Sequence, residues 1–351
     1  MNHAQDNRIL SLFGIELPVI QAPMAGSTTP QMVIAASEAG GLGSLPGASL
    51  SVEQMKTALD QIRAATAKPI NLNFFAHQSP QPDPVGQLAW RSLLAPYYVE
   101  QGLDPASAPP SAGRAPFDES YCEVVEAYRP EVVSFHFGLP AQALWDRVKS
   151  TGAKIIASAT TVAEARWLAE RGVDAVIAMG YEAGGHRGNF LSDDMSTQVG
   201  TMALVPQVVD AVDIPVIAAG GIADRRGVRA AFALGASAVQ VGTAYLYTPE
   251  ASIPAYYREA LHRVRDDSTA VTNVFTGRPA RGIVNRLIGE IGPLSTLAPA
   301  FPTAGGALVP LRAVTEKAGS GQFSNMWAGQ GAALARDRSS AELTRYLGTP
   351  G

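Results

Sequence analysis

The chain alternates short apolar runs with longer segments whose apolar residues recur at helical spacing. Eight such runs occur, and most are apolar throughout rather than alternating. Strands buried on both faces of a parallel sheet have this pattern, and crossover helices connect them. The pattern therefore predicts an α/β fold, with eight parallel strands closed into a (β/α)8 barrel. The predicted strands are Val19–Ala22, Gly41–Ser44, Ile70–Phe74, Val132–Phe137, Lys154–Ser158, Ala175–Met179, Pro215–Ala219 and Ala238–Val241.

A segment with helical spacing accompanies each run, so every predicted strand gains a helix. Thr161 and Asp224 begin two of these segments and are typical N-cap residues, which accept hydrogen bonds from the first turn of a helix. The predicted helices are Pro30–Ala39, Val52–Ala65, Ser120–Tyr128, Pro140–Thr151, Thr161–Arg171, Gly200–Ala211, Asp224–Leu234 and Ser252–Val264.

Two segments fall outside this repeat. His77–Phe117 is rich in Pro, Ser, Ala and Gln and is too long for an ordinary loop after a strand. It leaves the C-terminal end of the third strand, where such barrels carry their active sites. The tail, Val271–Gly351, contains a predicted helix near Ser340–Leu347 and is expected to pack over the barrel mouth. We therefore expect a barrel over residues 1–270 with an insertion at 77–117, and a C-terminal extension over 271–351.

Composition and charge narrow the range of partners. The net charge is −4 and the longest basic block is Arg225-Arg226, so we expect neither nucleic acid nor an anionic membrane as a partner. No stretch approaches the roughly 20 apolar residues of a membrane helix, and the N-terminus lacks an apolar signal core. Cys122 is the single cysteine, which excludes an internal disulfide and fits a cytoplasmic location. The five histidines show no metal-ligand spacing, so no metal is expected.

The segment Gly180–Gly188 follows the sixth predicted strand and contains four glycines, with His186 among them. Glycines let backbone N–H groups approach a ligand, and histidine can exchange a proton near neutral pH. A flexible polar turn is the alternative interpretation. The position at the C-terminal end of a barrel strand favours a functional loop with His186 as its chemical group.

Two further glycine turns follow the seventh and eighth predicted strands, at Ala218–Ile222 and Gln240–Thr243. Barrels of this class commonly bind phosphate with these two loops. The helix that begins at Asp224 would add its N-terminal amides and its dipole. Turns that serve packing alone are the alternative, but their occurrence on consecutive strands favours a phosphate site.

Polar residues also end the first, third and fourth predicted strands. Gln21–Gly26 closes the first strand and can place backbone groups around a flat ring. In the third strand, Asn71 is expected to face the site if inward-facing positions alternate along the strand. Asn73 is either a second site residue or a residue with a purely structural role. His136 is either a site residue or a barrel histidine whose hydrogen bonds are satisfied.

Together these motifs resemble the nitronate monooxygenases, formerly called 2-nitropropane dioxygenases, and most closely their class I. The resemblance covers nearly the whole chain and implies a TIM barrel that binds one non-covalent FMN. It also implies oxidation of alkyl nitronates, such as propionate 3-nitronate, with O2 to a carbonyl compound and nitrite, without a metal. By motif, His186 corresponds to the catalytic histidine. The motifs are Gln21–Gly26, Ser134–Gly138, Ser158–Thr161, Glu182–Gly188, Gly220–Ile222 and Trp327–Gly331.

The resemblance also implies a set of site residues. An anionic nitronate would be held by protonated His186 or by Lys317, whereas a neutral nitroalkane would need His186 as a base. His136, Tyr97 and Tyr98 are further candidates for contact with the substrate. The protein is expected to be a monomer or a homodimer. The residues expected to contact FMN are Ala22, Pro23, Met24, Asn71, Met179, Gly184, Gly185, Ala219, Gly220, Gly221, Gln240, Val241, Gly242 and Thr243.

One position departs from the family pattern. Relatives usually carry Gln immediately before the glycine that opens the loop, whereas this chain has Met179. The change removes a hydrogen bond to the flavin, although the polarizable thioether can still pack against an aromatic ring. The redox potential or the substrate range is therefore where we expect this protein to differ from its relatives.

Two other functions are compatible with the same residues. A flavin on this barrel could take electrons from NAD(P)H and reduce a quinone or an enoyl thioester, as related barrels do. The barrel could also bind flavin or phosphate without turnover, as a sensor. The presence of His186 among so many glycines argues against the second of these.

Overall fold

The fold is an eight-stranded parallel barrel, given by a computed structural model that describes residues 6–107 and 114–349. The strands follow the order β1-β9-β8-β6-β5-β4-β3-β2. A parallel bridge between Ile20 and Leu42 joins the two ends of this order. All eight predicted strands are present, so the predicted barrel is confirmed. They are β1 (Val19–Gln21), β2 (Gly43–Pro46), β3 (Ile70–Phe75), β4 (Val132–His136), β5 (Lys154–Ala159), β6 (Ala175–Met179), β8 (Val216–Ala219) and β9 (Ala238–Val241).

Helices surround the barrel at the positions that the apolar spacing predicts. Thr161 Oγ1 accepts a hydrogen bond from Glu164 N at 3.2 Å, and Asp224 Oδ1 accepts one from Arg226 N at 2.9 Å, which confirms both N-caps. None of the described helices is both long and apolar enough to cross a membrane. The surrounding helices are α2 (Pro30–Glu38), α3 (Val52–Ala65), α5 (Glu119–Tyr128), α6 (Gln142–Ser150), α7 (Val162–Glu170), α8 (Thr201–Val209), α9 (Arg225–Ala233) and α10 (Ala255–Arg263).

The N-terminal end of the barrel is covered by α1 (Arg8–Phe13), a helix that the sequence pattern does not indicate because six residues are too few to show a period. Ile9 and Phe13 form one buried cluster with Ile156 and Ile217 of the strands. The barrel therefore has a packed apolar floor at this end.

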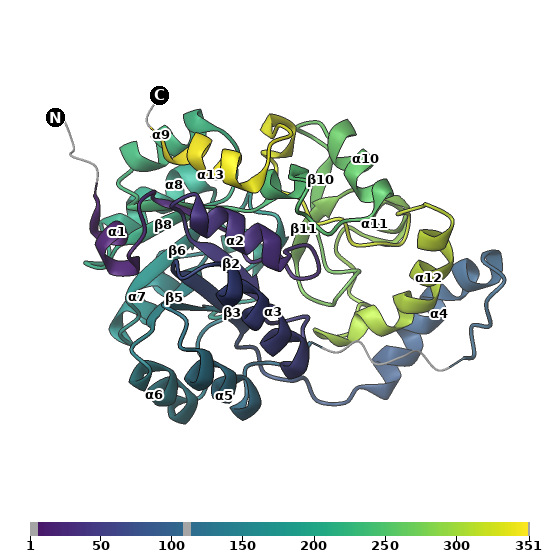
Figure 1. Cartoon of the computed structure of the whole chain (residues 1–351). Helices are drawn as coiled ribbons and strands as arrows, with labels where there is room; N and C mark the ends of the chain where they lie inside the picture. Colours follow the sequence, from purple (N-terminus) through teal and green to yellow (C-terminus); the bar gives the residue numbers. More distant parts are fainter. Residues whose placement is uncertain (1–5, 108–113, 350–351) are drawn as a thin grey trace.

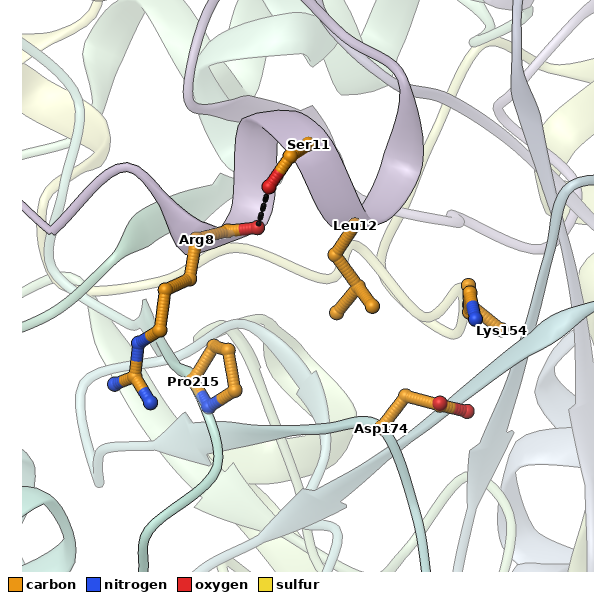
Figure 2. Close-up of a pocket in the computed structure, with 6 residues that line it drawn as sticks. All are labelled: Arg8, Ser11, Leu12, Lys154, Asp174 and Pro215. Carbon is orange, nitrogen blue, oxygen red and sulfur yellow. Dashed lines mark hydrogen bonds between the residues drawn. The ribbon is translucent and has the colours of Figure 1, made fainter.

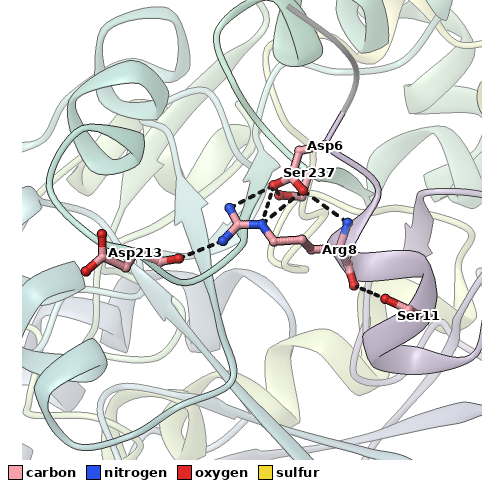
Figure 3. Close-up of polar contacts among 5 residues, drawn as sticks. All are labelled: Asp6, Arg8, Ser11, Asp213 and Ser237. Atoms are coloured by element: carbon pink, nitrogen blue, oxygen red, sulfur yellow. Dashed lines mark hydrogen bonds and ion pairs between the residues drawn. The ribbon is translucent and has the colours of Figure 1, made fainter.

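Arg8 fixes α1 to this end of the barrel. Its Nη1 donates a hydrogen bond to the Asp213 carbonyl at 2.6 Å, and its Nη2 donates to Asp6 Oδ2 at 2.8 Å (Figure 3). A small surface pocket opens beside α1, at the N-terminal ends of β5, β6 and β8 (Figure 2). Residues at this end of such barrels serve stability, so we assign the pocket no part in the chemistry. Its lining residues are Arg8, Ser11, Leu12, Lys154, Asp174 and Pro215.

The insertion after β3 contains a 17-residue helix, α4 (Pro84–Glu100), which packs with the C-terminal segment rather than with the barrel. Its buried residues share a second hydrophobic cluster with η3 (Thr303–Leu308), α11 (Arg286–Ile291) and α12 (Val309–Lys317). Figure 1 shows α4 and α12 together at the end of the molecule opposite α1. Residues 108–113 of the predicted insertion lie outside the described part of the chain.

The C-terminal segment returns over the barrel mouth, as predicted. A three-stranded antiparallel sheet joins β10 (Thr269–Thr272) and β11 (Ala280–Ile283) to β7 (Gly185–His186), which belongs to the loop after β6. The final helix, α13 (Ser340–Gly348), packs against α2 on the outside of the barrel (Figure 1). Short 3-10 helices complete the structure: η1 (Met195–Thr197), η2 (Thr243–Tyr247) and η4 (Ala332–Leu334).

Candidate active site

A cavity of about 360 Å³ opens at the C-terminal ends of the strands, under the C-terminal segment. This is the end at which barrels of this class place their active sites. His186 and His136 line it together with most of the residues predicted from the strand ends. Those predicted residues are Ala22, Pro23, Met24, Met179, Gly184, Gly185, Ala219, Gly220, Gly221, Gln240, Gly242 and Thr243.

Two residues predicted to hold the cofactor do not line the cavity. Asn71 points into the barrel one layer deeper, where its Nδ2 donates to Ser44 Oγ at 3.0 Å. Asn73, two residues further along β3, faces the same way and reaches the cavity. Val241 alternates with Gln240 and Gly242 and packs outward into the core between strands and helices.

Three residues predicted to contact substrate also lie elsewhere. Tyr97 and Tyr98 are buried in the cluster formed by α4, where the Tyr98 hydroxyl donates to the Ala307 carbonyl at 2.5 Å. Lys317 is exposed at the end of α12. The two tyrosine side chains therefore pack in a hydrophobic cluster, and the lysine side chain faces solvent. Residue type alone does not predict either position.

The C-terminal segment and the insertion supply lining residues that sequence reasoning missed. Arg114 lies near the end of the insertion, Arg312 comes from α12, and Trp327, Gly329 and Gly331 come from the motif near residue 330. The resemblance already singled out Trp327–Gly331, but gave it no role. Arg114 and Arg312 had no local signal, because their approach to the cavity depends on the path of the whole chain.

The loop after β6 is held in place by the C-terminal segment. Gly185 and His186 pair with Arg281 and Ala280 of β11. A Cβ atom on Gly184 would lie 2.6 Å from the backbone nitrogen of Gly329, so only glycine permits this contact. The loop is therefore closely packed against the C-terminal segment and is not a flexible turn.

His186 has one ring nitrogen fixed and one open to the cavity. Nε2 lies 3.0 Å from Thr276 Oγ1, and this hydroxyl directs its own proton to the Arg278 carbonyl at 3.3 Å. Nε2 is therefore the protonated nitrogen. Within the described chain Nδ1 has no hydrogen-bond partner and is not fully buried, so it is the atom that can accept a proton from a ligand.

His136 braces the same loop. Its Nδ1 lies 2.5 Å from Ser158 Oγ, and its Nε2 lies 3.1 Å from the backbone carbonyl of His186. Since a carbonyl only accepts, Nε2 is the donor and Nδ1 accepts the serine proton. Both ring nitrogens are satisfied, which gives His136 a positioning function.

The surroundings keep the histidines at the cavity neutral. Burial lowers the pKa of His136 to about 3 and that of His77 to about 4, with Arg278 adding to the effect on His77. Burial also lowers the pKa of His186 well below its usual value, and Arg114 is the next contributor. In the free protein at neutral pH, His186 is therefore a base and not a cation.

This neutrality predicts loss of stability in mild acid. The unfolded chain protonates its histidines near pH 6.5, whereas the folded chain does not, so the unfolded state binds more protons below that pH. Stability consequently rises with pH across this window. For protein freed of ligand, we expect the free energy of unfolding in urea to fall by on the order of 1 kcal/mol per pH unit for each of the three histidines between pH 6.5 and 5. His77→Gln should reduce this slope. Equal stability at pH 6.5 and 5 would contradict the assignment.

The turns after β8 and β9 form the other side of the cavity. Gly220 and Gly221 have φ angles of +113° and +72°, a conformation that favours glycine and exposes backbone amides. The first amides of α9 are less available than the sequence suggests, because Asp224 accepts hydrogen bonds from Arg226 N and Gly227 N. On this side of the cavity, the glycine turns therefore present the backbone amides that are better placed to meet a ligand.

The cavity is electropositive. Arg114 and Arg312 line it, whereas no aspartate or glutamate does so in the described chain. Burial lowers the pKa of Arg114, and the nearby Arg312 lowers it further. Arg312 Nε is paired with Glu316 Oε1 at 2.9 Å outside the cavity lining, whereas Arg114 adds a partly buried positive charge, which favours an anionic ligand.

Comparison with known proteins places these observations in a family. The family model described as nitronate monooxygenase matches residues 6–348. The chain is 41% identical over 343 residues to the nitronate monooxygenase of Pseudomonas aeruginosa, covering 97% of this chain and 98% of that one. It is 39% identical to the nitronate monooxygenase of Paraburkholderia phytofirmans, over 97% and 93% of the two chains. Among solved structures, a nitroalkane oxidase from Streptomyces ansochromogenes superposes with a TM-score of 0.87 at 38% identity, covering 97% of this chain and 96% of that one.

Proposed function

This chain belongs to the nitronate monooxygenase family, and from that premise we propose that it uses FMN and O2 to oxidise alkyl nitronates, such as propionate 3-nitronate, to a carbonyl compound and nitrite. The observation that carries the proposal is the cavity at the barrel mouth. It combines anion-binding glycine turns, two arginines and the open Nδ1 of His186, and in the described chain no carboxylate lines it.

The residues of the cavity fit FMN. Gln240 lines the cavity, and its buried Oε1 has no partner within the described chain, so a ligand that donates an N–H would satisfy it. Gly220 and Gly221 would hold the phosphate through their amides, and Met179 would pack against the ring. FMN would supply the two-electron acceptor that no side chain here provides.

The protein's own groups would bind the substrate and move its proton. Arg114 and Arg312 attract a nitronate, because both are cationic and line the cavity. A neutral nitroalkane would lose its proton to His186 Nδ1, which is uncharged and open. Phe301 and Trp327, with ring centroids 5.2 and 5.4 Å from that of His186, exclude water around this base.

A panel of reductants tests the proposal. The purified protein should be yellow, and in air it should release one nitrite for each propionate 3-nitronate consumed, with uptake of O2. Without O2, the nitronate should bleach the flavin. If NADH bleaches it and the nitronate does not, the protein is instead a reductase of quinones or enoyl thioesters. If neither does, the barrel binds flavin without turnover.

Arg312 should distinguish substrates by their charge. We expect Arg312→Ala to raise the KM for propionate 3-nitronate about tenfold, which corresponds to roughly 1.4 kcal/mol, and to change the KM for ethyl nitronate much less. The physical reason is that only the first substrate carries a second anionic group. Lys317→Ala is the matched control, because Lys317 lies on the same helix but outside the cavity. Equal effects of Arg312→Ala on both substrates would contradict the assignment, and so would a selective effect of Lys317→Ala.

A further inference from the structure

Arg187 directly follows His186 in the loop after β6, and it is a fully buried cation. Its side chain is 0% exposed, and every hydrogen bond it makes within the described chain is to a neutral acceptor. Nη1 donates to the Gly180 carbonyl at 2.6 Å and Nη2 to the Met179 carbonyl at 2.9 Å. Nε and Nη2 both donate to Gln198 Oε1, at 3.1 and 3.0 Å.

The charge of Arg187 is not paired directly with a carboxylate in the described chain. The two nearby acids are occupied by other donors: Glu164 accepts from Thr160 N and Oγ1, and Glu182 accepts from Thr201 N and Oγ1. Gln198 stands between Arg187 and Glu164, because its Nε2 donates to Thr160 Oγ1 at 3.0 Å. Burial, followed by the neighbouring Arg281, lowers the pKa of Arg187 to about 10. A buried cation in this state destabilises the fold unless some other negative charge compensates it.

The position of Arg187 indicates where that charge would be. Met179, whose carbonyl it holds, lines the cavity through its side chain. The glycine turn after β8 packs on the same segment, since a Cβ on Gly220 would lie 3.2 Å from the Gly180 carbonyl oxygen. Arg187 therefore lies directly behind the cavity wall, in a region shielded from water.

We propose that Arg187 raises the reduction potential of FMN bound in this cavity. The inference rests on the proposed function, because it requires that the cavity hold FMN. Two-electron reduction adds negative charge to the bound flavin, and a fixed cation behind the wall stabilises that charge more than it stabilises the oxidised state. The Met179 side chain brings neither a charge nor an N–H donor to this wall, so the positive charge closest behind it is the guanidinium that holds its carbonyl.

The test cancels the charge while keeping Arg187 in place. Gln198→Glu puts a carboxylate where Arg187 already donates two hydrogen bonds, so the guanidinium should stay and form a bidentate ion pair. We expect the equilibrium constant for two-electron reduction of bound FMN to fall about tenfold, a shift of roughly 30 mV in the midpoint potential. Gln207→Glu adds the same charge on the exposed face of α8 and should leave the potential unchanged.

A second pair of variants separates charge from geometry and remains informative if Gln198→Glu does not fold. Arg187→Lys keeps a cation but loses the planar fork, so the potential should stay near the wild-type value although stability falls. Arg187→Met removes the charge and should lower the potential at least as far as Gln198→Glu does. A Gln198→Glu potential equal to the wild-type value overturns the proposal, and so does an equal shift in Arg187→Lys and Arg187→Met. Nitrite release by the same wild-type holoenzyme tests the proposed function separately, whereas a chain that binds no FMN overturns both.

Discussion

Replacing His186 by asparagine is expected to lower kcat/KM for a neutral nitroalkane by about 10²- to 10⁴-fold, the usual contribution of a general base. The loss follows from the open Nδ1, because no other uncharged base with a free ring nitrogen lines the described cavity. For a preformed nitronate the proton is already gone, so the loss should be smaller, on the order of tenfold. Stopped-flow bleaching of the flavin without O2 measures both values.

The contrast between the two substrates is the decisive feature of this experiment. His262→Asn is the control, because His262 is a half-exposed histidine on α10, where it faces Asp337 at 3.5 Å, away from the cavity. Equal losses for nitroalkane and nitronate in His186→Asn would show that His186 binds substrate and does not take its proton. Unchanged turnover with both substrates would remove His186 from the mechanism.

Gly184→Ala is expected to damage the site by displacing the C-terminal segment. The new Cβ would lie 2.6 Å from Gly329 N and 2.7 Å from the carbonyl carbon of Ala328, and neither backbone atom can move without shifting the C-terminal segment. Overpacking of this kind costs about 1–3 kcal/mol. Because Gly329 also lines the cavity, we expect FMN affinity to fall at least about tenfold, measured by quenching of flavin fluorescence.

Gly289→Ala provides the matched control for this variant. Gly289 lies in α11, and a Cβ there would meet no atom within 4 Å. An alanine at that position should leave FMN binding unchanged and stabilise the helix slightly. Wild-type FMN affinity in Gly184→Ala would mean that the C-terminal segment can separate from the loop without consequence for the site.

The barrel strands could be predicted from the sequence because both of their faces are buried, which leaves a clear apolar run at each one. The site residues at the strand ends follow from the same pattern, since the C-terminal ends of parallel strands meet at one rim. His186, Gly220 and Gln240 are examples. Helix α1 could not be found in this way, because it is shorter than two turns.

Residues that reach the cavity from distant segments could not be predicted. Lys317 and Arg312 show why: five residues on a helix differ in direction by about 140°, so one faces solvent and the other the cavity. The phase of α12 is set by its packing with α4, which the sequence pattern did not indicate as a helix. Tyr97 and Tyr98 of α4 were predicted to contact the substrate, because the helix that orients them was not predicted either. They instead form part of the contact between the insertion and the C-terminal segment.

The contribution of Trp327, Gly329 and Gly331 to the cavity has a consequence for biosynthesis. The last barrel strand ends at Val241, so the ribosome must add about 90 more residues before the ligand-binding surface is complete. At roughly 5–20 residues per second, this interval lasts several seconds. During this interval the mouth of the nascent barrel lacks the residues that the C-terminal segment supplies, Arg312 among them. We therefore expect a cofactor to bind only after the C-terminal segment has been synthesised.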